Sequence, residues 1–331
     1  MSSVAVLGAG AWGTALAHHL ASHGHATRLW ARRQDFALQL ARTRQSPLLP
    51  HVLLPDSVAV SHRFADVLAG VDTVVLAAPC HTVREVLGAA APEWPAAATL
   101  VTAAKGIEND SLLTVSEVAT QVLGARLTQP VVVFSGPSFA REVADGKPTN
   151  VVAAADDDDA AERVQLLFSH GRLRVYTSSD PVGVQIAGAL KNVIAIAVGA
   201  SDGLELGYNA RAALITRGVT EIGRLAVAKG GQAATVAGLA GLGDLILTCT
   251  GELSRNRTVG LELGRGRPLA QVLSSLGHVA EGVTTARSAN DLAIQLGVDL
   301  PICSQVCQVL YDGKLPRDAV DDLLRRPLKR E

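Results

Sequence analysis

The spacing of apolar residues changes once along this chain, near Asp180. Before that point, short runs of Val, Leu and Ala alternate with segments whose apolar residues recur at helical spacing. Because continuous apolar strands separated by helices are typical of a parallel sheet covered on both faces, the sequence predicts a doubly wound α/β domain. The predicted strands are Val4–Leu7, Ala26–Trp30, Val71–Ala78, Thr99–Ala104, Val131–Phe134, Asn150–Ala155 and Leu173–Thr177.

The predicted helices of this part follow Gly13 and lie near His81–Ala90, Ser111–Leu123, Ser138–Val143 and Ala160–Ser169. After Asp180-Pro181, a pair that favours a helix start, the pattern is helical and rich in Ala and Leu. A chain of 331 residues commonly forms two domains. We therefore predict an α/β domain over residues 1–180 and an all-α domain over residues 181–331.

The motif Gly8-x-Gly10-x-x-Gly13 lies between the first predicted strand and the first predicted helix. Gly8 permits a tight turn, Gly10 lets the backbone approach a pyrophosphate, and Gly13 permits close packing of helix and strand. The helix N-terminus adds N–H groups and a positive dipole end for the phosphates. The motif therefore predicts a dinucleotide site.

The second predicted strand is followed by Arg32 and Arg33, where an NAD-selective site usually has Asp or Glu for the ribose 2′-hydroxyl. Two guanidinium groups suit a 2′-phosphate, because their planar forks bind phosphate oxygens in pairs. We therefore expect NADPH to be preferred, with NADH as the second cofactor. The alternative interpretation is a solvated basic helix start with Asp35 as its N-cap.

Ligands of an open parallel sheet bind beyond the carboxyl ends of its strands. Lys105 follows one such end, and the segment with Gly136 and Ser138 follows another. The Lys105 ammonium, backbone N–H groups and the Ser138 hydroxyl could hold a polar substrate there. A surface lysine and a simple capped turn are the alternatives.

Two charged residues interrupt the most apolar segments of the second half. Lys191 lies in a run of Val, Ile, Ala and Leu, and Asp244 precedes another apolar run. Since an unpaired buried charge is costly, we expect a desolvated Lys–Asp site in which Lys191 protonates or polarises a carbonyl oxygen. A structural lysine and a helix N-cap at Asp244 are the alternatives.

Downstream, Ser254, Arg255, Asn256 and Arg257 put hydroxyl, guanidinium and amide groups into one short segment. We expect that combination to bind a phosphoryl group; the alternative is an exposed basic turn.

Composition disfavours several classes of partner. The net charge of −1 provides no basic field for nucleic acid or an anionic membrane. The apolar stretches Val182–Ala200 and Ala233–Thr248 contain polar residues, so neither predicts a membrane span. The first strand starts at Val4 and leaves no room for a signal peptide, so we expect a cytoplasmic protein.

No metal site is predicted. Cys303 and Cys307 are four residues apart, but two thiols make an incomplete zinc site, and we expect reduced cysteines. The consecutive carboxylates Asp156–Asp159 indicate a solvated turn with an N-cap. Four histidines crowd the end of the first helix, where a cation suits the helix dipole and no carboxylate is near. They are His18, His19, His23 and His25.

Taken in order, the motifs resemble those of one family, over nearly the whole chain. They are Gly8-Ala-Gly-Ala-Trp-Gly-Thr-Ala-Leu, Lys105-Gly106, Phe134-Ser-Gly-Pro-Ser-Phe-Ala, Gly188-Ala-Leu-Lys-Asn-Val, Gly241-Leu-Gly-Asp-Leu and Ser254-Arg-Asn-Arg. The chain resembles the bacterial members of the NAD-dependent glycerol-3-phosphate dehydrogenase family. This resemblance implies NAD(P)H-dependent, reversible reduction of dihydroxyacetone phosphate to sn-glycerol 3-phosphate, which feeds phospholipid synthesis.

The resemblance also implies roles for individual residues, with Lys191 as the catalytic acid and base. The implied substrate contacts are Lys105, Gly136, Ser138, Lys191, Asp244, Ser254, Arg255 and Asn256, the last two on the phosphate. The implied cofactor contacts are Gly8, Gly10, Ala11, Trp12, Gly13, Arg32, Arg33, Lys105, Ala140, Arg255, Val279 and Glu281. The family often has Ser at the position of Ala11, so here the backbone N–H alone remains for a phosphate contact.

Two other functions fit parts of the pattern. A related 3-hydroxy-acid dehydrogenase would share the two-domain plan, but such enzymes commonly have Asn three residues after the lysine, where this chain has Ile194. A non-catalytic NADPH sensor would bind the cofactor without turnover and would need no proton donor. The apolar faces of the helical domain are compatible with a homodimer.

Overall fold

The computed structural model describes residues 1–276, 280–328 and 330, and the chain divides into two compact units. Unit 1 comprises Met1–Lys105 and Leu113–Pro181, and unit 2 comprises Gly106–Leu112 and Val182–Glu331. We expected a single boundary after residue 180, but the segment Gly106–Leu112 also belongs to unit 2. Ile107 packs into the core of unit 2, and its carbonyl accepts a hydrogen bond from Ser288 Oγ at 2.9 Å.

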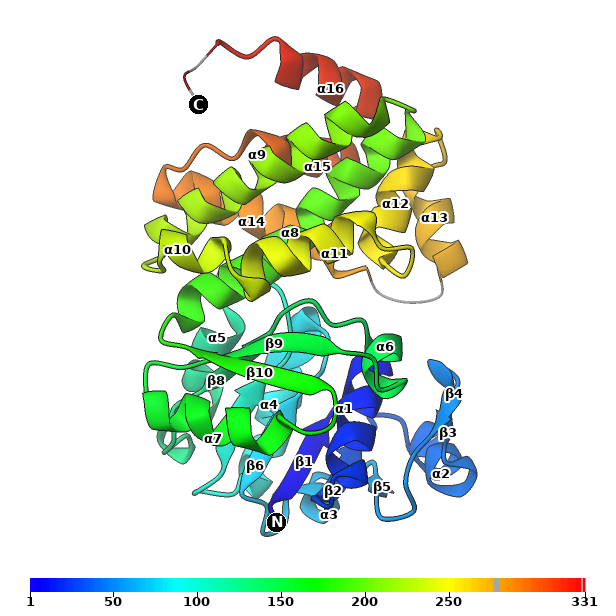
Figure 1. The fold of residues 1–331 in the computed structure, drawn as a ribbon, viewed down its shortest axis with the longest axis vertical. Coiled ribbons are helices and arrows are strands. Elements are labelled where there is room, and N and C mark those ends of the chain that lie inside the picture. The colour runs from blue at the N-terminus through cyan, green and yellow to red at the C-terminus, as the bar shows by residue number, and fades with distance from the viewer. Residues whose placement is uncertain (277–279, 329, 331) are drawn as a thin grey trace. The chain divides into compact units, whose positions relative to one another are not determined.

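Unit 1 is built on an eight-stranded sheet in the order β10-β9-β8-β7-β6-β1-β2-β5. Its strands are β1 (Ser3–Leu7), β2 (Ala26–Trp30), β5 (Ala59–Ser61), β6 (Thr73–Leu76), β7 (Thr99–Thr102), β8 (Val132–Ser135), β9 (Thr149–Ala154) and β10 (Leu173–Ser178). The chain reverses its direction of travel across the sheet between β1 and β6, which pair in parallel (Figure 1). In such sheets a ligand crevice forms at this reversal.

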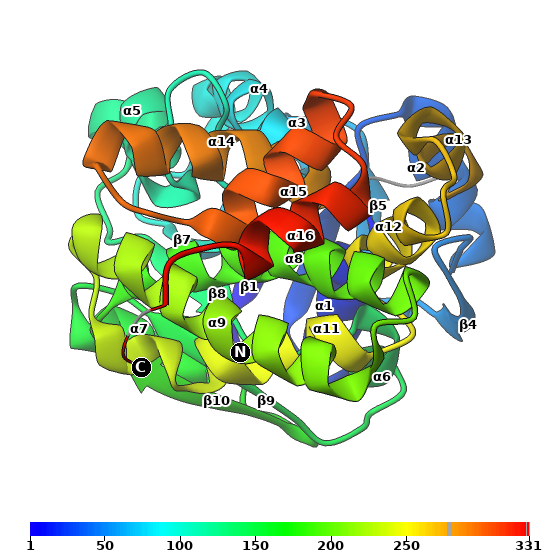
Figure 2. The same ribbon diagram turned by 90° about the horizontal axis from the view of Figure 1, so that it is seen from above.

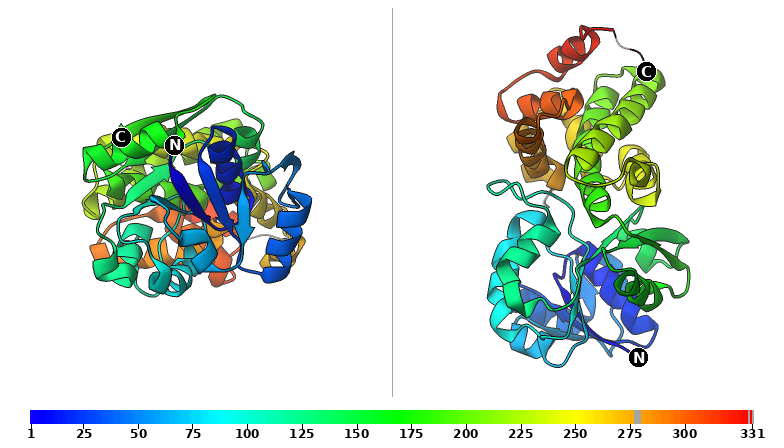
Figure 3. Two further views of the ribbon diagram at one scale, coloured as in Figure 1. Left: turned by 90° about the horizontal axis from the view of Figure 1, so that it is seen from below. Right: turned by 90° about the vertical axis from the view of Figure 1, so that its left-hand side faces the viewer.

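Helices cover both faces of the sheet, as predicted (Figure 3, left). Val4 and Val6 of β1 join one core with α1 (Ala11–Ser22), α2 (Gln34–Thr43) and α7 (Asp158–Phe168). The alternate residues Ala5 and Leu7 join a second core with α3 (Phe64–Leu68), α4 (Val83–Ala90) and α5 (Val115–Leu123). This alternation follows from the two-residue period of a strand, which sends successive side chains to opposite faces.

The prediction of a wholly parallel sheet is wrong at one pair. β8 and β9 are antiparallel, whereas every other pair in this sheet is parallel. A parallel return requires a crossover that commonly contains a full helix, and this connection carries only the short α6 (Ala140–Ala144). The chain therefore turns back beside β8.

Several local boundaries also differ from the predictions. The helix expected from Ser111 starts at Val115, because Leu112 has a φ of +57° and Thr114 and Glu117 form a capping box. Arg33, and not Asp35, is the N-cap of α2. Asp157 caps α7 by accepting from Ala160 N at 2.6 Å, which confirms the predicted capped turn.

Some short elements of unit 1 had no distinct pattern in the sequence. They are α2, α3, β5, the hairpin β3 (Gln45–Ser46) with β4 (Leu49–Leu53), and the 3₁₀ turns Cys80–Thr82, Ala91–Glu93 and Gly124–Arg126. Most of these segments have two to five residues, too few for periodicity to identify them, and the ten-residue α2 has only two buried positions, Ala37 and Leu40.

In unit 2, the regular elements that the structure describes over residues 182–331 are all helices, as predicted. Its helices are α8 (Pro181–Gly203), α9 (Gly207–Ala228), α10 (Ala233–Val236), the π-helix Leu239–Gly243, α11 (Asp244–Thr250), α12 (Arg255–Gly264), α13 (Leu269–Leu276), α14 (Glu281–Leu296), α15 (Pro301–Tyr311) and α16 (Pro316–Leu324). The other helices of the unit surround α8 (Figures 1 and 2).

Two segments of unit 2 are long and apolar enough to cross a membrane by length and composition alone. In the first, Pro181–Gly203, 89% of the most apolar window is buried in the protein, which is the property of a core helix. The second, Ala233–Thr250, is interrupted by the π-helix.

Helices α8 and α12 approach so closely that their backbones touch. A Cβ on Gly260 would lie 1.9 Å from Ile196 O, and one on Gly264 would lie 2.3 Å from Ala200 O. From the opposite side, a Cβ on Gly199 would lie 2.1 Å from Arg257 O. Only glycine fits these positions, so the contact fixes the distance between the two helices.

A buried carboxylate holds the start of α15. Glu221 of α9 is 2% exposed, and its two oxygens accept from Ile302 N at 2.7 Å and Cys303 N at 3.1 Å. Burial raises the pKa of Glu221 to about 7, even though these hydrogen bonds favour the charged form. The side chain thus serves as a cap for a helix whose own N-cap, Leu300, offers no side-chain acceptor.

The expectation of a cation at the end of α1 is wrong for His19. His19 is buried, and burial lowers its pKa to about 4, so it is neutral near pH 7 and adds no cation to the helix dipole. The four cysteines are free thiols as expected: Cys80, Cys249 and Cys303 are buried and Cys307 is half-buried.

The helix contact predicts opposite effects for two glycine substitutions. Gly260→Ala places a methyl group on the α8 backbone, so we expect it to lower the free energy of unfolding by about 3 kcal/mol. Gly223→Ala, within α9, adds a methyl group that meets nothing within 4 Å, so helix propensity should raise stability by about 0.5–1 kcal/mol. Urea unfolding of both variants measures this; equal effects would contradict the backbone contact.

Candidate active site

Lys191 of α8 and Asp244 of α11 form a buried ion pair. Lys191 Nζ donates to Asp244 Oδ1 at 2.6 Å and to Thr248 Oγ1 at 2.9 Å. The side chains of Lys191 and Asp244 are only 9% and 1% exposed. The predicted Lys–Asp pairing is therefore confirmed.

Thr248 is a partner that the sequence reasoning missed. Its hydroxyl donates to the Asp244 carbonyl at 2.6 Å, so its oxygen faces Lys191 as an acceptor. A threonine four residues after the aspartate on a predicted helix shares its face, and that spacing was the available signal. Lys191 Nζ is thus held in a fixed direction by two residues of α11.

A π-helix sets the start of α11. Residues Leu239–Gly243 form it directly before Asp244, and a Cβ on Gly241 would lie 2.1 Å from Val236 O. Short π segments are frequent at functional sites, where they redirect side chains. Asp244 is the first residue of α11 and its side chain bonds Lys191, so the alternative interpretation of Asp244 as an N-cap is wrong. The N-cap is Gly243.

Asn192, the neighbour of Lys191, belongs to a chain of amides that joins three helices. Gly282 N at the start of α14 donates to Asn256 Oδ1 at 2.9 Å, and Asn256 Nδ2 donates to Asn192 Oδ1 at 2.8 Å. Asn192 Nδ2 in turn lies 3.4 Å from Gly188 O. The Asn256 side chain, predicted to contact substrate, is therefore buried and bonded within the protein.

The other polar residues at the start of α12 differ in their exposure to solvent. Ser254 is buried and caps the helix, accepting from Arg257 N at 3.2 Å. Arg257 donates through Nε and Nη2 to Asp202 Oδ2 at 3.1 and 2.7 Å. Arg255 is exposed at the first helical position.

The glycine turn of unit 1 has the geometry that its motif predicts. Gly8 has a φ of +122°, and a Cβ on Gly13 would lie 1.8 Å from Gly8 O. A Cβ on Gly10, by contrast, would meet nothing within 4 Å. The protein itself does not require glycine there, so the open space before the N-terminus of α1 fits the approach of a pyrophosphate.

Arg32 and Arg33 follow the carboxyl end of β2, and both are exposed. Arg33 Nε lies 3.8 Å from Asp35 Oδ1, a loose pair in which both side chains are more than two thirds exposed. Such a pair contributes little to stability, and it leaves both guanidinium groups accessible to a ligand.

Lys105 and Ser138 meet at one backbone carbonyl of unit 1. Lys105 Nζ lies 3.4 Å from Gly136 O, and Ser138 Oγ donates to the same oxygen at 2.9 Å. Gly136 has a φ of +144°, and a Cβ there would lie 2.9 Å from Val151 Cα. The carboxyl ends of the neighbouring strands β7 and β8 thus bring these predicted residues together.

The other predicted cofactor residues lie in different parts of the two units. Trp12 of α1 and Ala140 of α6 pack against one small apolar cluster of unit 1. Glu281 is the first residue of α14 in unit 2. Val279 lies outside the described residues.

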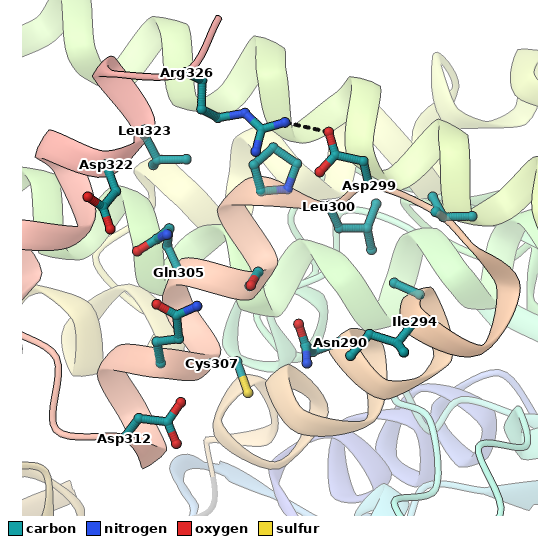
Figure 4. Close-up of a pocket in the computed structure, with 15 residues that line it drawn as sticks. Asn290, Ile294, Asp299, Leu300, Gln305, Cys307, Asp312, Asp322, Leu323 and Arg326 are labelled. Atoms are coloured by element: carbon teal, nitrogen blue, oxygen red, sulfur yellow. Dashed lines mark hydrogen bonds and ion pairs between the residues drawn. The ribbon is translucent and has the colours of Figure 1, made fainter.

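A cavity of about 430 Å³ lies elsewhere in unit 2, between α14, α15 and α16 (Figure 4). Asn290, Gln305, Cys307 and Asp312 are among its lining residues, and none of the predicted site residues lines it. No group of three or more potential metal ligands occurs within the described part of the chain. Burial raises the pKa of Cys249, beside the Lys191 site, to about 12, so this thiol stays protonated.

The buried pair predicts strongly non-additive stability changes. Lys191→Met leaves the Asp244 carboxylate buried without its main cation, so we expect a loss of about 3–5 kcal/mol in the free energy of unfolding. Adding Asp244→Asn removes that charge and should recover part of the loss. Lys147→Met, which breaks an exposed pair with Glu142, is the control and should change stability by less than about 0.5 kcal/mol. Additive losses in urea unfolding would contradict a coupled buried pair.

Comparison with known proteins places the chain in one family. Residues 3–161 match the NAD-dependent glycerol-3-phosphate dehydrogenase N-terminus, and residues 180–321 match the corresponding C-terminus. The chain is 51% identical to glycerol-3-phosphate dehydrogenase [NAD(P)+] of Syntrophotalea carbinolica over 99% of both chains. It is 52% identical to the protein of the same name from Geobacter metallireducens, over 99% of this chain and 98% of that one.

A solved structure gives the same result. The glycerol-3-phosphate dehydrogenase of Coxiella burnetii is 38% identical, with a TM-score of 0.94 over 98% of this chain and 99% of that one. These matches cover both units from end to end. The chain therefore belongs to the NAD-dependent glycerol-3-phosphate dehydrogenase family.

Proposed function

We propose that this chain catalyses the reversible reduction of dihydroxyacetone phosphate to sn-glycerol 3-phosphate, with Lys191 as the proton donor and acceptor. The chain is an NAD(P)-dependent oxidoreductase of its family. The observation that carries the role of Lys191 is its buried ammonium, held by Asp244 and Thr248. A cationic donor shielded from water suits the protonation of a developing alkoxide.

The start of α12 supports a phosphate site. A helix N-terminus attracts phosphate through its N–H groups and dipole, and the exposed Arg255 adds a guanidinium. Because the Asn256 side chain is bonded to Asn192 and Gly282, we assign its phosphate contact to the backbone N–H. The proposed substrate contacts are Lys105, Gly136, Ser138, Lys191, Asp244, Ser254, Arg255 and Asn256.

The glycine turn and the open space at Gly10 support a dinucleotide site in unit 1. The exposed Arg32 and Arg33 support a preference for NADPH over NADH. The full set of proposed cofactor contacts is Gly8, Gly10, Ala11, Trp12, Gly13, Arg32, Arg33, Lys105, Ala140, Arg255, Val279 and Glu281.

In the proposed mechanism, the protein supplies the proton that the carbonyl oxygen receives. Reduced nicotinamide, when held by the proposed cofactor contacts, would supply the hydride for C2 of the ketone. Lys191 donates its proton to the carbonyl oxygen as negative charge develops there, while Asp244 and Thr248 keep Nζ in a fixed direction. Contacts to the remote phosphate orient the carbonyl, so their binding energy lowers the barrier. In the reverse direction, the neutral Lys191 amine accepts the hydroxyl proton.

We further infer a cytoplasmic enzyme that supplies glycerophospholipid synthesis and forms a homodimer. The exposed apolar side chains Leu206 and Tyr208, which are 42% and 80% exposed at the start of α9, support a protein partner for unit 2. The comparisons do not favour the hydroxy-acid dehydrogenase or the NADPH sensor.

Removing the Lys191 ammonium should abolish proton transfer without abolishing cofactor binding. We expect Lys191→Ala to lower kcat at least about 10²- to 10⁴-fold in the reduction of dihydroxyacetone phosphate. Lys191→Arg keeps a cation beside Asp244 but cannot release its proton, so it should be similarly slow. NADPH binding, measured by fluorescence, controls for folding. Near-normal turnover of either variant would reject the role.

The two arginines after β2 should set the cofactor preference. We expect Arg32→Ala combined with Arg33→Ala to raise the KM for NADPH about 10- to 100-fold, the value of one or two lost charged hydrogen bonds, with little change for NADH. Arg42→Ala, an exposed arginine later in α2, is the matched control. An unchanged NADPH to NADH ratio in the double variant would exclude the 2′-phosphate contact.

A further inference from the structure

Four imidazole rings pack together at the end of unit 1 where β2 and β10 begin. They are His19 and His23 at the end of α1, His25 before β2, and His170 in the turn between α7 and β10; we call them the histidine cluster. The ring centres of His19 and His23 lie 4.6 Å apart, and His170 lies 5.3 Å from both His23 and His25. The cluster therefore joins segments that are far apart in the sequence.

The hydrogen bonds within the cluster define which nitrogens carry protons. His19 Nε2 must donate to Phe168 O at 2.9 Å, and His23 Nδ1 must donate to His19 O at 2.8 Å, because a carbonyl only accepts. His25 Nδ1 accepts from Ser2 N at 3.3 Å. A neutral His25 then carries its proton on Nε2 and donates to His170 Nε2 at 3.3 Å.

This arrangement is satisfied by neutral rings and opposed by charged ones. A proton added to His25 falls on Nδ1 and faces the Ser2 N–H. A proton added to His170 Nε2 faces the His25 N–H. Either protonation replaces a hydrogen bond with two opposed donors and places a positive charge among closely packed imidazole rings.

We propose that the histidine cluster is an acid-sensitive latch, closed when its rings are neutral, which holds the α7–β10 edge of the sheet to the end of α1 and opens as they are protonated. The α7 end of the latch is the hydrogen bond from His19 to Phe168, the last residue of that helix. The β10 end is His170, and β10 is the outermost strand on its side of the sheet. An edge strand has one neighbour, so it is the strand with least to lose by separating.

The charged groups around the cluster mostly add to the repulsion between protonated rings. His18 and the chain's amino terminus add positive charge near His19 and His25, respectively, and Asp72 is the acidic group that favours charged His25. Burial is the main cause that lowers the pKa of His18, His19 and His25, and neighbouring histidines add to it.

The pH window follows from the sign of these shifts. When the pKa of a histidine is lower in the folded protein than in the unfolded chain, the unfolded chain binds its proton at a higher pH than the folded protein does. Its contribution to stability is therefore complete above the unfolded value of 6.5 and is lost as the pH falls toward about 4, the value for His19. Glu221, with a raised pKa, acts in the opposite direction and is the same in every variant below.

The test compares the full chain with His170→Gln and His25→Gln in thermal unfolding between pH 7.5 and 4.5 at constant ionic strength. We expect the unfolding temperature of the unmodified chain to fall over this range and that of each variant to fall less, because one pair of opposed donors is gone while the buried His19 is unchanged. The slope with pH, and not the value at one pH, is the readout, so a uniform loss of stability does not mimic the result. His62→Gln, a histidine outside the cluster, should retain the original slope.

Nuclear magnetic resonance of the ring protons provides the second readout. We expect His25 to titrate below 6.5 in the unmodified chain and to move toward 6.5 in His170→Gln or His170→Asn. Equal pH slopes in all proteins, or a His25 titration unchanged by either His170 variant, would overturn the latch.

Discussion

The close approach of α8 and α12 is the constraint on which the rest of unit 2 depends. Gly199, Gly260 and Gly264 let two helix backbones touch, and no larger residue fits at these positions. The same pair of helices carries Asn192 and Asn256, whose amides bond at 2.8 Å. Lys191 lies on α8 and Arg255 is the first residue of α12, so the contact between the two helices sets how these two residues are placed.

The buried charge of Lys191 is a second constraint on unit 2. A lysine in the middle of a buried helix is tolerated only because Asp244 supplies a counter-charge and Thr248 an acceptor. Both come from α11, whose start is set by the π-helix before it. The packing of α11 against α8 thus places the two charges together. Removing either Lys191 or Asp244 would leave an unpaired buried ion, so the pair also favours this packing.

In unit 1, the glycines shape the turn between β1 and α1. Gly8 and Gly13 close the first turn against its own backbone, while Gly10 leaves the front of α1 open. At the opposite end of α1, the His19 and His23 rings bond backbone carbonyls, and the His25 ring bonds that of His170. The two ends of α1 therefore carry an open glycine turn and a group of packed imidazole rings.

The sequence by itself determined the fold class, the order of the long strands and helices, the glycine turn and the Lys–Asp pairing, because each depends on local periodicity or on the cost of one buried charge. Tertiary structure decided the antiparallel β8–β9 pair, the assignment of Gly106–Leu112 to unit 2, the capture of the Asn256 amide by Asn192 and the neutral state of His19. These features depend on contacts between residues far apart in the chain, whose distances no local pattern encodes.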